Sequence, residues 1–264
     1  MGGMTARAAV ATTLAPGGAR SRVSTLRSQG HLVLRPRNPV EPEPLTHRRA
    51  GVARVALAAG TAGPVGGDDF HLDVRVGAGS TLVLSDVSSM LVLPGPHGDR
   101  SRMRVSVRVE EGATLVWIPR PVIAARRCRH THDVRVSLEA DARLVLREEV
   151  LLGRHREEPG DFTTTLRVTL DGRALYHQRL RFGPDADGSR GEAVLGGNRA
   201  AGSVIAVDPA WAGATPPPDA FAPGAALTAL PGPGVLVTAV APDNLPLRRL
   251  LDAGLDRLGD PWRP

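Results

Sequence analysis

The sequence predicts a mainly β protein made of stacked strand-turn-strand layers, β-helix-like or sandwich-like, with about two helices, one of them at the C-terminus. Three observations predict this fold. Apolar and polar residues alternate with period two in many segments, short turns containing Gly or Asp separate these segments, and similar units recur about every 30 residues.

The N-terminal part lacks a clear strand signal. Residues 1–20 have no apolar periodicity and contain Pro16-Gly17-Gly18, which predicts a flexible tail ahead of a single β-rich domain over 21–264. The stretch 35–44 contains four prolines. Because proline has no N–H to donate to a β ladder, this stretch favours an extended loop.

Regular strands are predicted from the middle of the chain onward. Residues 103–109 alternate Met or Val with Arg or Ser, as expected of a strand with one buried face. The segments 134–138 and 166–170 repeat this pattern. Asp171-Gly172 then predicts a type I′ hairpin turn that leads into a strand over 174–182.

Part of the β region is repeated. The segment 76–84 resembles 109–117 and 138–146, and 170–176 is a tighter fourth copy. Each unit reads as a strand, a turn of small residues and a second strand, and such units bury their apolar faces by stacking on their neighbours. The alternative is coincidental similarity among β-hairpins in a compositionally biased chain.

The C-terminal region is predicted to close the domain. A Pro/Gly-rich loop over 208–234 precedes a strand over 235–240. A helix follows, with Asp243 or Asn244 as its cap. Its apolar stripe, which most simply packs on the β layers, consists of Leu247, Leu250, Leu251, Leu255 and Leu258.

Composition and missing motifs exclude several classes of function. All 33 basic residues are arginines spread along the chain, without the basic stripe and interleaved aromatics of a nucleic-acid-binding protein. No apolar run is long enough to span a bilayer, and the single Cys rules out a disulfide within the chain. We therefore expect a cytoplasmic protein that binds neither nucleic acid nor membrane.

The usual catalytic motifs are also missing, which predicts that the protein is not an enzyme. There is no GxSxG elbow, P-loop, HExxH or CxxC motif. Asp68-Asp69 and His132-Asp133 are interpreted as turns or exposed edges, and Glu148-Glu149 as a solvated charge run. A hydrolase with scattered catalytic residues is the remaining enzymatic alternative, but no nucleophile-and-base pair suggests one.

One group of residues has metal-binding chemistry. Cys128, His130 and His132 are spaced two apart, so on a strand their side chains project from the same face. Thiol and imidazole donors suit nickel, copper or zinc, although no fourth ligand is adjacent. The alternative interpretation is a partly buried cysteine beside two surface histidines.

The order of motifs from residue 50 to 258 resembles the urease accessory protein family UreD, also called UreH. The motifs that carry the resemblance are the Gly-rich turn 64–68, the strand-turn 76–80, the segment 112–121, Gly153-Arg154, the hairpin at Asp171-Gly172, and the closing strand and helix. The chain departs from the family pattern at Ala62-Gly63, at Gly160-Asp161, and in 84–92, where the family's Lys and Tyr are missing.

The resemblance implies a non-enzymatic scaffold or metallochaperone that assists GTP-dependent nickel delivery into apo-urease together with UreF and UreG. It implies no tightly bound cofactor and only transient nickel. The candidates for a polar conduit or for packing, taken from the matching motifs, are Gly66, Gly67, Asp68, Ser85, Asp86, Ser88, Gly153 and Arg154. The alternative is a β-sandwich or solenoid ligand-binding module unrelated to urease, which the scarcity of aromatic residues disfavours.

Overall fold

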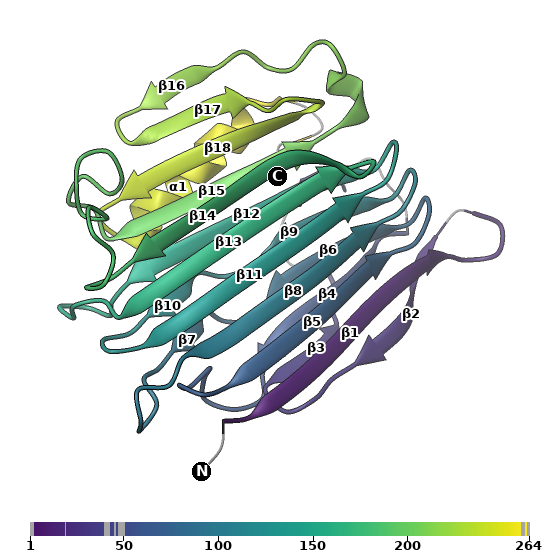
Figure 1. The fold of residues 1–264 in the computed structure, drawn as a ribbon. Coiled ribbons are helices and arrows are strands. Elements are labelled where there is room, and N and C mark those ends of the chain that lie inside the picture. Colours follow the sequence, from purple (N-terminus) through teal and green to yellow (C-terminus); the bar gives the residue numbers. More distant parts are fainter. Residues whose placement is uncertain are drawn as a thin grey trace.

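Two β-sheets lie face to face in the computed structural model, which describes residues 3–18, 20–39, 43–44, 46, 51–259 and 262 (Figure 1). Sheet A has seven strands in the order β14-β13-β11-β8-β5-β1-β2. Its strands are β1 (Thr5–Leu14), β2 (Ser21–Arg27), β5 (Asp69–Val76), β8 (Ser101–Val109), β11 (Arg129–Leu138), β13 (Asp161–Leu170) and β14 (Arg173–Phe182). The five inner strands are parallel, and the edge strands β2 and β14 are antiparallel to their neighbours.

Sheet B has eleven strands, and its main path runs β16-β17-β18-β15-β12-β9-β6-β4-β3. The first of these along the chain are β3 (Leu32–Pro36), β4 (Ala53–Ala59), β6 (Thr81–Asp86), β7 (Met90–Val92), β9 (Thr114–Ile118) and β10 (Val122–Ala124). The later ones are β12 (Arg143–Leu152), β15 (Ala200–Val207), β16 (Asp219–Ala222), β17 (Ala225–Ala229) and β18 (Gly234–Ala241). Helix α1 (Asn244–Asp256) packs on the outer surface of this sheet, against β15, β17 and β18.

The predicted repeat is confirmed as a structural unit. The pairs β5–β6, β8–β9 and β11–β12 each cross from sheet A to sheet B through a short turn. Equivalent residues of the copies are direct β partners: Val76 pairs with Val109, and Val109 with Leu138. This register puts the apolar residues of successive copies in one ladder, so each layer buries its core face against the next.

The crossing turns share one backbone conformation. The third residue after the strand has a positive φ in each copy, +65° at Gly79, +61° at Gly112 and +57° at Asp141. The fourth copy differs because β13 and β14 form a hairpin within sheet A. Asp171 and Gly172 have φ of +48° and +73° there, which confirms the type I′ turn predicted from Asp-Gly.

The N-terminal segment is a strand, so the prediction of a flexible tail is wrong for residues 5–14. Strand β1 pairs with β5 in parallel and with β2 in antiparallel orientation. Its core-facing residues are Ala6, Ala8 and Val10, all buried. Two of these three are alanines, which gave too weak an alternation to be read as a strand from sequence.

The C-terminal predictions are partly confirmed. The strand over 235–240 is β18, and α1 follows with Asp243 as its N-cap. The stretch 208–234 is more ordered than a loop, because it holds the 3₁₀ turn Pro209–Trp211 and the hairpin of β16 and β17. Within the described residues α1 is the one α-helix, where the sequence predicted about two helices. No helix in that part of the chain is long and apolar enough to cross a membrane.

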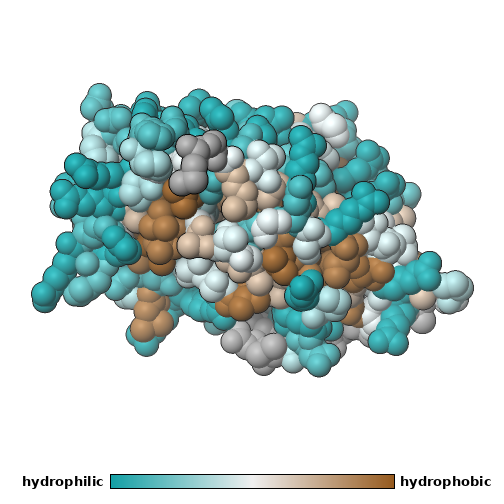
Figure 2. All heavy atoms as spheres, turned by 90° about the horizontal axis from the view of Figure 1, so that it is seen from below, coloured by the Kyte–Doolittle hydropathy of each residue, from teal (hydrophilic) through white to brown (hydrophobic). Residues whose placement is uncertain are grey.

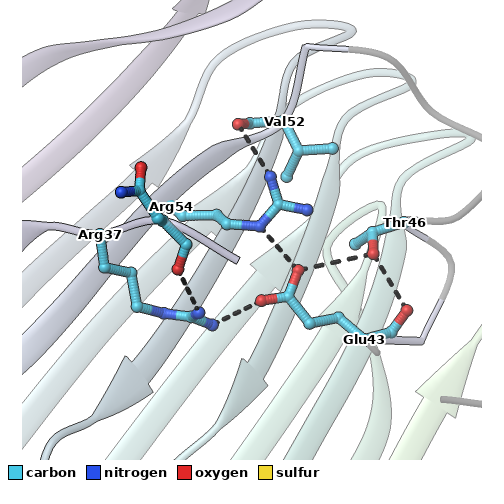
Figure 3. A network of polar contacts seen from close by, with 6 residues as sticks. Arg37, Glu43, Thr46, Val52 and Arg54 are labelled. Carbon is cyan, nitrogen blue, oxygen red and sulfur yellow. Dashed lines mark hydrogen bonds and ion pairs between the residues drawn. The ribbon is translucent and has the colours of Figure 1, made fainter. Parts of the chain in front are cut away.

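An acidic residue anchors the proline-rich stretch to the strand that follows it. The Glu43 carboxylate accepts hydrogen bonds from Arg37 Nη2 (2.5 Å) and Arg54 Nε (2.8 Å), and Thr46 Oγ1 donates to the Glu43 carbonyl (3.0 Å) (Figure 3). The Glu43 side chain is only 8% exposed. An ion pair shielded from water to this degree fixes the described part of the stretch beside β4.

The apolar core lies on both faces of sheet B. One cluster fills the space between the sheets, and a second lies between sheet B and α1. Sheet A has only its inner face in the core, because residues of β8 alternate between buried and exposed positions. Seen from below (Figure 2), the surface shows apolar residues in separate groups among hydrophilic ones.

The two ends of the stack differ. At one end the crossing turns are short, as described above. At the other end, here called the loop end, the connections are longer: 60–68, 87–100, 119–128, 153–160 and 183–199. Most of the candidate residues from the sequence lie in or beside these longer connections, where binding residues of rigid scaffolds commonly occur.

Candidate functional site

A cavity of about 420 Å³ lies between the sheets toward the loop end. Sheet A lines it with residues that include His132 and Thr164, and sheet B with residues that include Asp86 and Glu148. Residues 193–195, from the connection between β14 and β15, also line it. Most of the lining is apolar, so the few polar groups in it are exceptional and can define what the cavity binds.

Asp86 reaches the cavity from the end of β6. Leu84 and Leu82, two and four residues earlier, lie on the same face of the strand and are fully buried. Burial raises the pKa of the Asp86 carboxyl to about 7, although a hydrogen bond from the Arg120 backbone and the Arg120 charge act in the opposite direction. Its Oδ1 atom is buried and has no hydrogen-bond partner among the described residues.

Glu148 reaches the same cavity from the middle of β12. Burial raises the pKa of its carboxyl to about 7, and the hydroxyl of Thr164 on β13 donates a weak hydrogen bond to Oε1 (3.4 Å). Burial and the nearby Glu148 also raise the pKa of the Tyr176 hydroxyl to about 12. The carboxyl groups of Asp86 and Glu148 thus lie in one mostly apolar cavity, which Glu149, Arg120 and Arg147 also border. Buried carboxylates need a cation or hydrogen bonds to offset their desolvation.

His132 supplies a nitrogen donor from β11. Burial lowers the pKa of its imidazole to about 4, with Asp133 acting weakly in the opposite direction, so the ring is neutral at physiological pH. Its Nδ1 atom is buried without a partner among the described residues. A neutral imidazole with a free nitrogen is the form of histidine that binds a metal ion.

Cys128 and His130 lie apart from the cavity lining. Burial, then Asp161 and Glu157, raise the pKa of the Cys128 thiol to about 12, which disfavours the thiolate that binds metals. His130 is buried, with Nδ1 2.9 Å from Ser101 Oγ and its ring stacked on Phe162. Within the described ranges no three His, Cys, Asp or Glu side chains form a group that could hold a metal. Of the three predicted ligands, only His132 lines the cavity.

Asp68 occupies a structural position in the Gly-rich turn. Its Oδ1 accepts a hydrogen bond from the backbone N–H of Met4 (2.7 Å), and its Oδ2 accepts one from Val65 (2.8 Å). The residue is 8% exposed and does not line the cavity. Hydrogen bonds between a carboxylate and backbone amides are strong, so Asp68 anchors the start of β1 to the turn before β5. The sequence predicted either a polar conduit or a packing role for Asp68, and these contacts support the packing role.

Gly66 lies where two backbones approach closely. A Cβ atom on Gly66 would be 2.5 Å from the amide nitrogen of Gly95 and 2.6 Å from the carbonyl oxygen of Asp99. The neighbouring Gly67 has a φ of +96°, which favours glycine. Both glycines therefore serve the packing of the loop end.

We expect Gly66→Ala to lower the free energy of unfolding by about 3 kcal/mol, because the clashing atoms belong to backbone that cannot rotate away. The control is Gly191→Ala, where the nearest atom to the new Cβ is 3.2 Å away. Denaturant unfolding measures both variants. Equal stabilities of the two variants would contradict the close approach.

The remaining predicted residues lie outside the cavity. Ser85 is on the opposite face of β6 from Asp86, and Ser88 is exposed in the bend that follows. Gly153 has a φ of +80°, and a Cβ there would be 2.2 Å from the carbonyl oxygen of Glu157. Arg154 forms an ion pair with Glu157 (2.7 Å). Gly153-Arg154 thus shapes a tight surface loop.

Sequence reasoning missed Glu148 and Glu149, and their interpretation as a solvated charge run is wrong. Glu148 points between the sheets toward Thr164, and Glu149, whose side chain is 0% exposed, borders the cavity beside Arg147 from the other face of β12. Their burial could have been recognised from their position inside the apolar run 144–152, because such a run is typical of a strand buried on both faces.

Taken together, the fold and the cavity define a class: β-helix-like proteins of two stacked sheets, with a mostly apolar cavity between them at the loop end that holds a few buried polar groups. Within that class, comparison with known proteins places the chain. The family model described as "UreD urease accessory protein" matches residues 5–263. The chain belongs to this family.

Similar curated proteins agree with this assignment. The urease accessory protein UreD of Frankia alni is 41% identical over 280 residues, covering 96% of this chain and 93% of that protein. UreD of Parafrankia sp. is 39% identical, with 94% and 86% covered. UreD of Streptomyces coelicolor is 43% identical, with 78% and 82% covered. The resemblance stated from the motifs is confirmed over nearly the whole chain.

Proposed function

We propose that this protein is a non-enzymatic scaffold of urease maturation, which assists GTP-dependent nickel delivery into apo-urease in the cytoplasm together with UreF and UreG. The family supports the maturation role. The observation that supports nickel passage is the cavity, where Asp86, Glu148 and His132 present oxygen and nitrogen donors.

The donor set suits a cation in transit. Imidazole nitrogen and carboxylate oxygen both bind divalent nickel, but the cavity offers few such donors and no complete cage. Asp86 Oδ1 and His132 Nδ1 are buried without hydrogen-bond partners among the described residues, which destabilises the folded protein as long as no ligand contacts them. A cation that binds them loosely can be released again to the next acceptor.

Family membership argues against the alternative of a ligand-binding module unrelated to urease. The described cavity is lined mostly by apolar residues, so a small apolar molecule is the competing occupant. To distinguish a nickel ion from a small apolar molecule as the occupant, a fluorescent apolar probe is bound to the protein, and its displacement by Ni²⁺ is compared with its displacement by Mg²⁺. Our proposal expects only Ni²⁺ to displace the probe.

The proposal is tested by co-expressing the tagged chain with urease subunits, UreF and UreG. We expect the three partners to be retained on the tag, and the nickel content of urease to rise only when GTP can be hydrolysed. The control omits the tagged chain. If no partner is retained, or if nickel enters urease equally well without this chain, the scaffold role is excluded.

The nickel hypothesis for Cys128, His130 and His132 stays a prediction, and the cavity favours His132 as its active member. We expect His132→Ala to lower the nickel bound per chain in calorimetry. The double variant Cys128→Ala with His130→Ala tests the other two residues. A loss of nickel in the double variant alone would assign the site to Cys128 and His130.

A further inference from the structure

The outer face of sheet A is uncovered, whereas the outer face of sheet B is largely covered. Helix α1 packs on β15, β17 and β18 of sheet B, and Trp262 is buried in the same cluster. In Figure 1 sheet A faces the viewer, and no described element lies in front of it. Sheets with parallel strands are usually covered on both faces, so this bare face is unusual.

The uncovered face is rich in arginine. Six of its strands carry outward arginines, which alternate with the buried residues of each strand: Arg7, Arg75, Arg102, Arg135, Arg167 and Arg179. The outward acidic residues of these strands are Asp69, Asp73, Asp133 and Asp161. Arg104 and Arg108 of β8 also point outward, and each is ion-paired, with Asp69 and Glu139 respectively.

Only part of this charge is neutralised within the chain. Arg135 and Arg167 share Asp133 (3.1 and 3.0 Å). Arg75 pairs with Glu110 (2.5 Å), Arg104 with Asp69 (2.7 Å) and Arg108 with Glu139. Arg102 and Arg179, in contrast, have no acidic partner among the residues that the structure describes. Unpaired arginines on one face attract a partner of opposite charge and steer its approach.

The shape of the face suits a large, flat partner. Between the arginines the outward residues are short, for example Ser106, Thr131 and Ser137. Seven strands at about 4.8 Å spacing make the face roughly 30 Å wide, which can supply the roughly 800 Å² that one partner contributes to a standard interface. Because the outward residues are polar, the face also tolerates water when no partner is bound.

We propose that this arginine face of sheet A docks an acidic surface of apo-urease, an inference that rests on the proposed function. Urease is the enzyme that the family description mentions, as the protein to which UreD is accessory. Nucleic acid fits the face less well, because Asp69 and Asp133 interrupt the continuous row of arginines that a phosphate backbone would need. The outward positions on the six strands also carry no Phe, Tyr or Trp on which a base could stack.

The test is the double variant Arg102→Glu with Arg179→Glu, chosen because neither arginine has an acidic partner in the described structure. The matched control is Arg35→Glu with Arg249→Glu, which makes the same change of charge at exposed residues of β3 and α1. Full-length protein is titrated against apo-urease at 50 and 300 mM NaCl. We expect the face variant to bind at least about 10-fold more weakly at low salt, and the control to bind like wild type.

The outcomes separate this inference from the proposed function. If wild type binds apo-urease and the face variant binds equally well, the arginine face is not the docking surface. If the control loses as much affinity as the face variant, the effect is one of net charge and the inference is also overturned. If wild type binds a labelled RNA at 150 mM NaCl and the face variant does not, the face is a nucleic-acid surface. If wild type does not bind apo-urease at all, the proposed function fails first.

Discussion

Arg147→Met is expected to lower the free energy of unfolding by about 3–5 kcal/mol, because it leaves a buried carboxylate without its partner. The Arg147 and Glu149 side chains are 3% and 0% exposed, and Arg147 Nε lies 2.5 Å from Glu149 Oε1. Arg147 also binds Asp252 Oδ1 (2.6 Å) and donates to the carbonyl of Arg248 (3.2 Å). The substitution therefore also detaches α1 from β12.

The variant should show a specific dependence on pH. Burial raises the pKa of Glu149, and Arg147 partly offsets this effect. Without Arg147 the folded-state pKa rises further above the unfolded value of about 4.3, so the folded state holds a proton that the unfolded state releases. The variant is then most stable below the unfolded pKa, and it loses stability as pH rises through the folded pKa.

Denaturant unfolding at pH 5 and pH 8 checks this expectation. The loss of stability relative to wild type should be larger at pH 8. The control is Arg147→Met with Glu149→Met, which removes both charges and should recover most of the loss. A double variant as unstable as the single one would show that the ties to α1, and not the buried charge, dominate.

The strands that could be predicted from the sequence are those with one face buried and the other in contact with water. Strands of sheet A alternate visibly, so β8, β11 and β13 were anticipated, and the recurrence of Val76, Val109 and Leu138 predicted the ladder that they form. Strand β1 was missed because alanine gives little contrast with its polar neighbours. The hairpin of β16 and β17 was missed because proline and glycine dominate its surroundings.

The candidate site was less predictable, because it depends on which strands of the two sheets face each other. The motif resemblance selected Asp86 and Ser85 equally, but side chains alternate along β6, so only Asp86 points between the sheets. Glu148 was hidden because both faces of β12 are buried and its two glutamates resemble a surface pair. Asp68 was selected from the Gly-rich motif, but its partners, Met4 and Val65, emerge only from the folded turn.

Asp86→Asn is expected to reduce nickel-dependent activation of co-expressed urease by about 10-fold or more, because it removes a carboxylate donor while keeping the volume of the side chain. The carboxyl lines the cavity, and its buried Oδ1 has no partner in the described part of the chain. An amide offers one neutral oxygen and turns an N–H₂ group toward the same space, so it binds a cation poorly.

The matched control is Ser85→Ala, one residue earlier on the opposite face of β6. It should leave activation unchanged. Urease activity and nickel per active site are measured after co-expression, together with the thermal stability of both variants. Burial raises the pKa of Asp86, so the charged carboxylate is unfavourable in the folded state, and Asp86→Asn should melt no lower than wild type at pH 8. Activation at the wild-type level in a stable Asp86→Asn variant would remove this cavity from the path of nickel, because no other change to the chain accompanies the loss of the carboxylate.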